Sequence, residues 1–269
     1  MKIFVTGGAG FIGSNYVRWV LANTDHEVTV FDSLSYAGNL STLKDVDDNK
    51  RYSFVKGNIC QPGDVDASMR GHDAVVHFAA ESHVDRSIVD PYAFVRTNAY
   101  GTNVMCDVAR QVEVQRFLHI STDEVYGSID EGSFAETDIL CPRSPYSASK
   151  ASSDLIALSY VTTHGLPVVV TRCSNNFGPY QFPEKLIPLF TTNLLDGKQI
   201  PLYGDGLNER DWLYQTPMDI LIKASNGASD FGNKFGQPLI TGSVLTFEHE
   251  SDARKLGFDK VIMLAGGIG

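Results

Sequence analysis

The sequence predicts an α/β protein, with a Rossmann-like, doubly wound parallel sheet followed by a small, incomplete or replaced C-terminal substrate lobe. Three observations predict this fold class. Short apolar segments alternate with longer amphipathic ones, the first apolar segment runs into a glycine-rich turn, and an aspartate ends the second. With 269 residues, of which 43% are hydrophobic, the chain is long enough to bury one large core.

Six short apolar segments are the expected strands: KIFVTG, EVTVFD, YSFVKG, DAVVHFA, RFLHIS and LPVVVTR. Helical stretches are expected to begin at Phe11, Pro91 and Pro145, between some of these segments. Strands that alternate with helices are typical of βαβ units. We therefore expect a parallel sheet with helices on both faces.

A glycine-rich turn follows the first strand. Gly7, Gly10 and Gly13 have the spacing G-x-x-G-x-x-G in GGAGFIG. Such glycines let the start of a helix approach a pyrophosphate, whose charge the free amide groups and the helix dipole accept. Asp32 lies 19 residues after Gly13, at the end of the second strand, where a ribose-binding acid is expected. The pattern predicts a dinucleotide site.

The residues around Asp32 indicate which dinucleotide binds. A carboxylate at this position accepts hydrogen bonds from free ribose hydroxyls and repels a 2′-phosphate. Its neighbours Phe31 and Ser33 supply no cation that would offset the repulsion. The predicted cofactor is therefore NAD rather than NADP.

The segment SPYSASK is expected to start a helix, with Ser144 as the N-cap and Pro145 at the first helical position. Tyr146 and Lys150 are then four residues apart and lie on one face of that helix. A nearby ammonium favours the phenolate. We therefore expect Lys150 to lower the pKa of Tyr146, which would make the phenol a base near neutral pH.

Two adjacent acids follow the strand RFLHIS. Asp123 and Glu124 come directly after the hydroxyl of Thr122, where the strand ends and a loop is expected. Like charges held close push their pKa values apart, so one acid can be protonated while its neighbour is ionised. The pair is expected to supply a general acid and a general base. The alternative is a pair of solvated loop acids.

Several long motifs together resemble the dTDP-glucose 4,6-dehydratases, a family of extended short-chain dehydrogenases/reductases. These motifs are GGAGFIG, HFAAESHVDRS, STDEVYG, SPYSASK, RCSNNFGPYQFPEKLIPLF and PLYGDGLN, and the resemblance covers residues 1–212. It implies a lyase that binds NAD and a nucleoside-diphosphate glucose such as dTDP-glucose. It also implies a homodimer.

The resemblance implies a role for each candidate catalytic residue. Tyr146 would take the proton of the carbon 4 hydroxyl as that carbon is oxidised by NAD, and the new ketone acidifies carbon 5. Glu124 would remove the carbon 5 proton, while Asp123 would protonate the departing hydroxyl of carbon 6. Return of the hydride to carbon 6 would give a 4-keto-6-deoxy sugar nucleotide. Thr122 and Lys150 complete the implied set.

The resemblance also implies binding residues, position by position. The implied NAD contacts, besides the three glycines, Tyr146 and Lys150, are Phe11, Ile12, Asp32, Ser33, Leu34, Ser35, Asn58, Ile59, Ala79, Ala80, Thr97 and Asn176. The implied sugar-nucleotide contacts are Ser82, Thr122, Asn175, Lys185, Leu186, Tyr203 and Arg210. Asn58 stands where the family usually has aspartate. We expect weaker NAD binding from it, because an amide oxygen still accepts a hydrogen bond.

The chain departs from the family pattern near Asp211. Residues 213–269 resemble an internal segment of phosphoribosylformylglycinamidine synthase, a purine-pathway amidotransferase, through GASDFGNKFGQP and LAGGIG. We expect a segment of other origin or, alternatively, a diverged substrate lobe. The predicted domains are an NAD-binding Rossmann domain (1–180), the start of a substrate lobe (181–212) and an atypical C-terminal segment (213–269).

Composition limits the remaining functions. The net charge of −10 argues against binding to nucleic acid or to an anionic membrane surface. No apolar run approaches the roughly 20 residues of a membrane span, and MKIFVTGG enters a strand directly, so a cytoplasmic enzyme is expected. Neither the histidines nor the cysteines have metal-site spacing, and Cys60, Cys106, Cys141 and Cys173 are expected to be reduced core thiols.

Two other functions stay open. The chain could be a chimeric or non-catalytic NAD-binding protein, because its substrate lobe departs from the family. It could also be a nucleotide-sugar epimerase, although that reaction leaves the acid pair unexplained.

Overall fold

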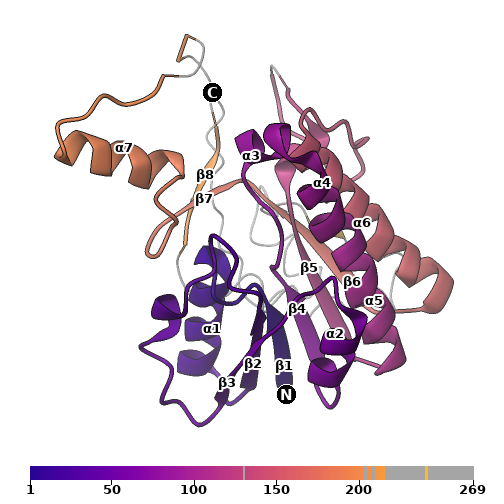
Figure 1. The fold of residues 1–269 in the computed structure, drawn as a ribbon. Coiled ribbons are helices and arrows are strands. Elements are labelled where there is room, and N and C mark those ends of the chain that lie inside the picture. The colour runs from indigo at the N-terminus through magenta and orange to yellow at the C-terminus, as the bar shows by residue number, and fades with distance from the viewer. Residues whose placement is uncertain (130, 203–204, 207–209, 216–239, 242–269) are drawn as a thin grey trace, which may run out of the picture.

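The apolar segments of the first 173 residues form one parallel sheet (Figure 1). The computed structural model describes residues 1–129, 131–202, 205–206, 210–215 and 240–241. The sheet has the order β3-β2-β1-β4-β5-β6-β9, and every neighbouring pair is parallel. Its strands are β1 (Lys2–Thr6), β2 (Glu27–Asp32), β3 (Tyr52–Lys56), β4 (Ala74–His77), β5 (Arg116–Thr122), β6 (Val168–Cys173) and the two-residue β9 (Ile240–Thr241).

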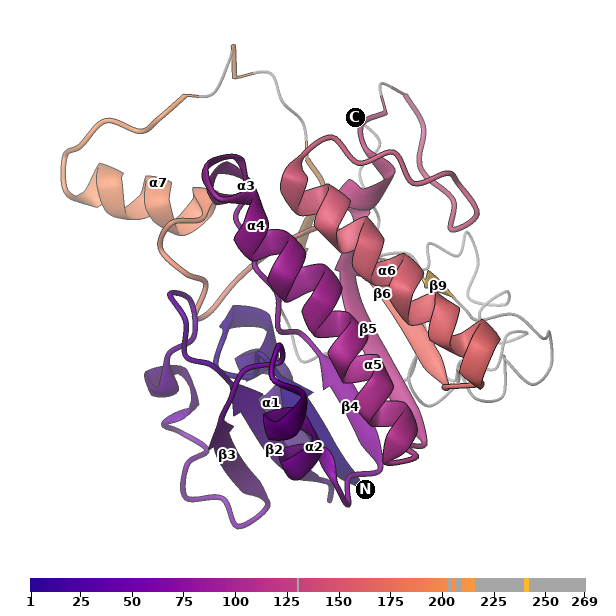
Figure 2. The same ribbon diagram turned by 45° about the vertical axis from the view of Figure 1, so that its right-hand side comes forward.

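Helices cover both faces of the sheet, as predicted (Figures 1 and 2). One face packs against α1, and the other packs against α2, α5 and α6. The long helices are α1 (Phe11–Asn23), α2 (Pro62–Met69), α5 (Thr102–Gln111) and α6 (Pro145–His164). Short pieces are η1 (Leu40–Leu43), α3 (Val84–Val89), α4 (Pro91–Phe94), the π turn η2 (Val95–Gly101) and the 3-10 turn η3 (Asp123–Tyr126).

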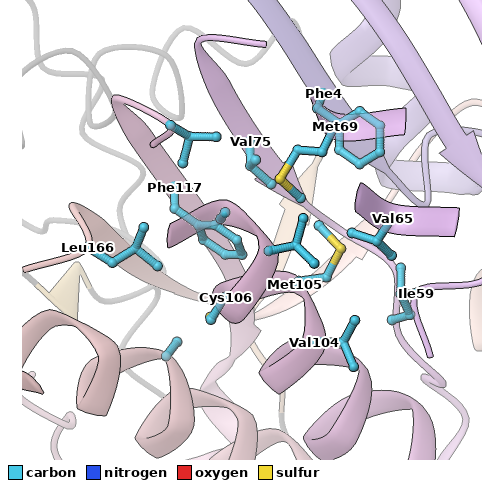
Figure 3. Close-up of a cluster of buried hydrophobic side chains, with 14 of the residues drawn as sticks. Phe4, Ile59, Val65, Met69, Val75, Val104, Met105, Cys106, Phe117 and Leu166 are labelled. Carbon is cyan, nitrogen blue, oxygen red and sulfur yellow. The ribbon is translucent and has the colours of Figure 1, made fainter. Parts of the chain in front are cut away.

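The alternation of side chains along the strands divides the core into two layers. Phe4 of β1 points into the layer that contains Val75, Phe117 and helices α2 and α5 (Figure 3). Its neighbours Ile3 and Val5 point into the opposite layer, against α1. Because both faces are covered, apolar side chains from these strands point into both layers, which explains the short apolar runs in the sequence.

The strand order places a crevice at the centre of the sheet. From β1 the chain winds outward to β2 and β3, then crosses back to β4 and winds the other way to β5 and β6. In doubly wound sheets ligands bind where the winding direction reverses, beyond the carboxyl ends of the strands. Here that point lies between β1 and β4.

The described residues 174–215, which follow β6, lie outside the seven-stranded sheet. Strand β7 (Asn175–Phe177) pairs in parallel with β8 (Trp212–Tyr214), and helix α7 (Leu186–Leu195) comes between them. Figure 1 shows α7 standing apart from the sheet and from α1 to α6. No residue of α7 is buried. Most of the predicted C-terminal segment lies outside the described residues, and the predicted domain boundaries stay predictions.

The structure bears on two further predictions, which concern the cysteines and membrane-spanning segments. Cys60 and Cys106 are buried and Cys173 is half-buried, but Cys141 is exposed, so the expectation of four core thiols is wrong at that position. All four thiols are free. None of the helices in the described part of the chain has the length and the apolar character needed to cross a membrane.

Candidate active site

A cleft of about 720 Å³ opens beyond the carboxyl ends of the strands, at the crevice between β1 and β4. This volume is in the range of cofactor and small-molecule sites. Residues that follow β1 to β6 all contribute to its walls. Of the predicted site residues that the structure describes, all except Leu34 line the cleft. The structure therefore brings the predicted cofactor, substrate and catalytic residues together. Tyr203 lies outside the described residues.

The glycine turn is shaped so that only glycine fits at two positions. A Cβ at Gly7, whose φ is +69°, would lie 2.6 Å from the backbone nitrogen of Ala79. A Cβ at Gly13 would lie 2.4 Å from the carbonyl oxygen of Gly7. Helix α1 begins directly after Gly10 without a side-chain cap. The first amide groups of α1 are thus left without a side-chain partner beside the cleft, which fits a bound pyrophosphate.

Asp32 links the glycine turn to the loop after β2. Its Oδ2 accepts a hydrogen bond from the backbone of Ala9 at 3.0 Å, and its Oδ1 accepts one from the backbone of Leu34 at 2.8 Å. Burial raises the pKa of Asp32, and these two hydrogen bonds oppose the rise. Each carboxylate oxygen has further acceptor capacity for a ribose hydroxyl. The amide of Leu34, a predicted NAD contact that does not itself line the cleft, holds Asp32 in place.

Asn58 lines the cleft at the end of β3, as predicted. Its side-chain oxygen accepts a hydrogen bond from the backbone of Cys60 at 2.9 Å. The amide therefore stabilises the turn that precedes α2. A second lone pair on this oxygen is left to accept from an adenine amine.

Tyr146 and Lys150 lie on the buried face of α6, as their spacing predicts. The helix begins at Pro145 with Ser144 as its N-cap, and Ser144 and Ser147 form a reciprocal capping box. Both functional side chains line the cleft, and Lys150 is only 5% exposed. Its Nζ donates a hydrogen bond to the carbonyl oxygen of Ile120 at 2.6 Å.

The predicted direction of the Tyr146 pKa is wrong for the protein alone. Burial raises the pKa of Tyr146, the charges of Glu124 and Cys173 raise it further, and hydrogen bonding with Thr122 opposes the rise only in part. Burial also lowers the pKa of Lys150. The sequence shows that the two groups share a helix face, but not that the face is buried. The phenol of Tyr146 is therefore neutral at neutral pH.

The two acids lie in a short turn of helix rather than in a loop. Strand β5 ends at Thr122, and Asp123 and Glu124 form the start of η3. The hydroxyl of Thr122 donates to Oδ1 of Asp123 at 3.2 Å and accepts from the backbone of Glu124 at 3.3 Å. One side chain thus positions both acids at the floor of the cleft.

Burial, more than mutual repulsion, shifts the pKa values of the acids. It is the largest cause of the raised pKa of Asp123, and Asp211 adds to it while the hydrogen bond from Thr122 opposes it. Burial also raises the pKa of Glu124, followed by the charge of Asp123, while the cations of Lys185 and Arg210 lower it. Asp123 therefore faces a further carboxylate and Glu124 faces two cations, which favours a protonated Asp123 beside an ionised Glu124.

The predicted substrate residues form the outer wall of the cleft. Lys185 precedes α7, and its Nζ donates to the carbonyl oxygen of Ser82 at 2.9 Å. Burial lowers the pKa of Lys185, while Glu184 and Glu124 raise it. Arg210, Asn175 and Leu186 also line the cleft. This wall combines cations with polar groups, as a sugar diphosphate requires.

Asn98 is a buried residue near the site that the sequence did not single out. Its amide nitrogen donates to the carbonyl oxygen of Glu81 at 3.0 Å and to the hydroxyl of Ser149 at 2.8 Å. Its amide oxygen accepts from the backbone of Glu81 at 2.8 Å. Asn98 thus ties the loop after β4 to α6 from within η2. A π turn has no readable sequence period, and such turns are frequent at functional sites.

Tyr36 and Arg86 form a second contact that the sequence did not predict. The guanidinium of Arg86 lies 4.0 Å from the ring centre of Tyr36, and it forms an ion pair with Glu184 at 2.9 Å. Tyr36 and Glu184 line the cleft. These contacts join the loop after β2 to the segment before α7.

The sequence of this chain matches one protein-family model and a set of curated proteins. The family model is described as GDP-mannose 4,6 dehydratase and matches residues 4–222. The dTDP-glucose 4,6-dehydratase of Streptomyces niveus is 57% identical over 219 residues, which is 80% of this chain and 65% of that protein. The dTDP-glucose 4,6-dehydratase of Shigella flexneri is 52% identical over 235 residues. The match thus spans 65% of the length of each of these two relatives, slightly less than two thirds.

Solved structures have a similar fold. DesIV, a dTDP-glucose 4,6-dehydratase from Streptomyces venezuelae with NAD and TYD bound, is 50% identical with a TM-score of 0.81, and the match covers 90% of this chain and 76% of DesIV. The UDP-glucuronic acid 4-epimerase of Bacillus cereus, in complex with UDP-glucuronic acid and NAD, is 26% identical with a TM-score of 0.78, over 91% of this chain and 76% of the epimerase.

Proposed function

This chain belongs to the GDP-mannose 4,6-dehydratase family, and from that membership we propose that it is an NAD-dependent lyase that dehydrates dTDP-glucose to the 4-keto-6-deoxy sugar nucleotide. The observation that carries the proposal is the placement of two acids, Asp123 and Glu124, in the same cleft as Tyr146, Lys150 and the dinucleotide turn. Relatives at 57% and 52% identity are dTDP-glucose 4,6-dehydratases, which supports this substrate.

The residues of the cleft fit NAD. The tight turn that requires Gly7 and Gly13 places the uncapped start of α1 beside the cleft, where it would hold a pyrophosphate, and Asp32 would accept hydrogen bonds from ribose hydroxyls. Lys150 reaches the same cleft from α6. When bound, NAD supplies the hydride acceptor for carbon 4 and the hydride donor for carbon 6.

Tyr146 takes the proton of the carbon 4 hydroxyl in the first step. Because burial raises the pKa of Tyr146, its phenol must lose a proton before it can act as a base. The cation of Lys150, one helical turn away, favours that loss. Thr122 hydrogen bonds with the phenol and fixes its direction. Oxidation leaves a ketone at carbon 4, which acidifies the carbon 5 proton.

Glu124 and Asp123 then carry out the elimination. Glu124, which faces the cations of Lys185 and Arg210, is the ionised member and removes the carbon 5 proton. Asp123, which faces the carboxylate of Asp211, keeps its proton and delivers it to the departing carbon 6 hydroxyl. Water leaves, and a double bond forms between carbon 5 and carbon 6. Hydride then returns to carbon 6, and Glu124 gives its proton back to carbon 5.

The two other functions receive less support. A 4-epimerase needs the tyrosine and the lysine but gives no role to a buried acid pair, and the matched epimerase is 26% identical against 50% for DesIV. A non-catalytic NAD-binding protein is favoured by one observation, the unburied α7. Both alternatives predict no 4-keto product from dTDP-glucose.

The homodimer implied by the resemblance is part of the proposal. Four large apolar side chains on neighbouring elements are strongly exposed: Ile88, Val89, Tyr92 and Val95, at 67%, 86%, 84% and 57%. Monomeric proteins seldom expose contiguous apolar surface of this kind, so a second copy is a suitable cover. Sedimentation equilibrium tests this, and a monomer at all concentrations contradicts it. The cytoplasmic location stays a prediction.

Incubation with dTDP-glucose and NAD tests the proposed function. We expect a product lighter than the substrate by one water, with a ketone absorbance in alkali. A product of unchanged mass would favour the epimerase. Bound NAD without any product would favour the non-catalytic protein.

A further inference from the structure

Helix α6 carries a third ionisable residue in line with Tyr146 and Lys150. Asp154 lies four residues after Lys150, as Lys150 lies four after Tyr146, so all three share one face of the helix. Asp154 is 0% exposed. A buried carboxylate on a helix face costs free energy unless it has charged partners.

Asp154 contacts two strands of the sheet. Its Oδ2 accepts a hydrogen bond from Nε of Arg172 on β6 at 2.9 Å. Its Oδ1 lies 3.3 Å from Nε2 of His119 on β5. The buried hydroxyl of Ser121 also contacts this carboxylate. One oxygen of Asp154 is therefore hydrogen-bonded to Arg172, and the other faces His119.

Several charged or titratable groups lie around Lys150 and Asp154. From α6 these are Tyr146 and Asp154, and from the strands they are His77, His119, Arg172 and Cys173. Burial lowers the pKa of His77 and of His119, and burial raises the pKa of Cys173 to about 11, so these three groups are neutral near neutral pH. Among these described groups, Asp154 alone carries a negative charge near neutral pH.

We propose that Asp154 is a positioning residue that keeps the buried Lys150 in its charged form at the floor of the cofactor cleft. In this arrangement the carboxylate of Asp154 favours the charged form of Lys150, and the ammonium of Lys150 favours the phenolate of Tyr146. Arg172 forms an ion pair with the same carboxylate. Tyr126 in turn accepts a hydrogen bond from Arg172.

The directions of the pKa shifts agree with this geometry. Burial lowers the pKa of Lys150, and the charge of Asp154 is the largest cause that opposes it. Burial acts to raise the pKa of Asp154, but contacts with His119 and Ser121 and the charge of Lys150 bring it below its usual value. The carboxylate is therefore ionised over the whole neutral range.

The effect of removing this charge follows from the sign of the interaction. Lys150 is charged below its pKa, and loss of a nearby carboxylate lowers that pKa by about 1 to 3 pH units. Without this carboxylate, Lys150 loses its charge at a lower pH. This consequence for the rate rests on the proposed dehydration. As the pH rises, the dehydration rate of Asp154→Asn should begin to fall at a lower pH than the rate of the parent.

Lysine NMR tests the proposal without any need for turnover. In protein labelled with ¹³C at the lysine ε carbons, the Lys150 signal is assigned by its loss in Lys150→Met. We expect this signal to titrate about 1 to 3 pH units lower in Asp154→Asn than in the parent. Asp154→Glu should restore much of the difference. Tyr126→Phe, which removes a partner of Arg172 but keeps Asp154, should leave the titration unchanged.

The outcomes separate this proposal from the proposed function. An unshifted Lys150 titration in folded Asp154→Asn overturns the positioning role, whether or not the parent makes product. If Asp154→Asn does not fold, the parent decides, because a Lys150 that is already neutral near neutral pH overturns the proposal as well. Absence of product from the parent, with the expected Lys150 shift, would overturn the dehydration alone.

Discussion

Helices α5 and α7 have the same length but opposite environments. Each has 10 residues, and α7 is the more apolar in sequence, yet α5 buries six residues against the sheet and α7 buries none. Figure 1 shows α5 packed on the sheet and α7 apart from it. An apolar helix becomes buried only if another element offers it a surface. The cofactor half of this chain contains that surface, and the described residues after β6 do not.

The cofactor side and the predicted substrate side of the cleft also differ in how firmly their residues are held. On the cofactor side, Asp32 and Asn58 are fixed by backbone hydrogen bonds within the sheet region. On the substrate side, Arg210 is exposed at the edge of the cleft and Lys185 lies at the start of α7. The family match ends at residue 222, and the relatives are longer. We therefore expect NAD binding to withstand changes that abolish substrate turnover.

Tyr146→Phe should give the largest effect. Loss of the phenolic proton acceptor should slow oxidation at carbon 4 by up to about 10⁴-fold, while the affinity for NAD stays close to that of the parent. Single-turnover absorbance of the reduced nicotinamide measures the rate, and calorimetry measures the affinity. A variant that still reduces NAD at the parent rate would show that another residue is the base.

Asp123→Asn and Glu124→Gln should each slow elimination by about 10²- to 10⁴-fold and leave the first oxidation possible. Reduced nicotinamide should then accumulate, because the hydride cannot return to carbon 6. Rapid quench with mass analysis measures the loss of water. Equal slowing of oxidation and elimination would mean that the acids serve binding rather than proton transfer.

Truncation of a core residue and of an α7 residue tests the comparison in stability. Phe117→Ala should lower the free energy of unfolding by about 3 to 5 kcal/mol, because the ring of Phe117 is 1% exposed. Leu195→Ala in α7 should change it by about 0.5 kcal/mol or less, because Leu195 is 82% exposed. Urea unfolding measures both. A large loss in Leu195→Ala would show that α7 is covered in solution.

Asp32→Ala should affect ligand binding less than the catalytic substitutions affect the rate. Loss of hydrogen bonds to a charged group costs about 1.5 to 3 kcal/mol, so NAD affinity should fall by about 10- to 100-fold. The preference for NAD over NADP should also weaken, because the carboxylate no longer repels a 2′-phosphate. Calorimetry with both dinucleotides measures this. An unchanged preference would place the selectivity elsewhere.

The sequence predicts the sheet and the cofactor cleft well because both depend on local patterns. The six apolar runs form six parallel strands, and each of them contributes apolar side chains to the core layers on both faces of the sheet. Gly7 and Gly13 could be located because no other residue fits the turn. The spacing of Tyr146 and Lys150 fixes their shared helix face.

The remaining features depend on tertiary environment. The raised pKa of Tyr146 follows from burial, which no local pattern shows. Asp154 has no local signature, because its partners Arg172 and His119 come from strands that are distant in the sequence. Asn98 lies in a π turn, and Leu34 acts through its backbone amide rather than its side chain.

Transfer of a deuterium label tests the central claim most directly. The chain is incubated with NAD and dTDP-glucose that carries deuterium at carbon 4. If the proposed reaction takes place in this cleft, the label leaves carbon 4 and is found at carbon 6 of a 4-keto-6-deoxy product, within the same molecule. A label that stays at carbon 4, as epimerisation or inactivity would give, contradicts the account.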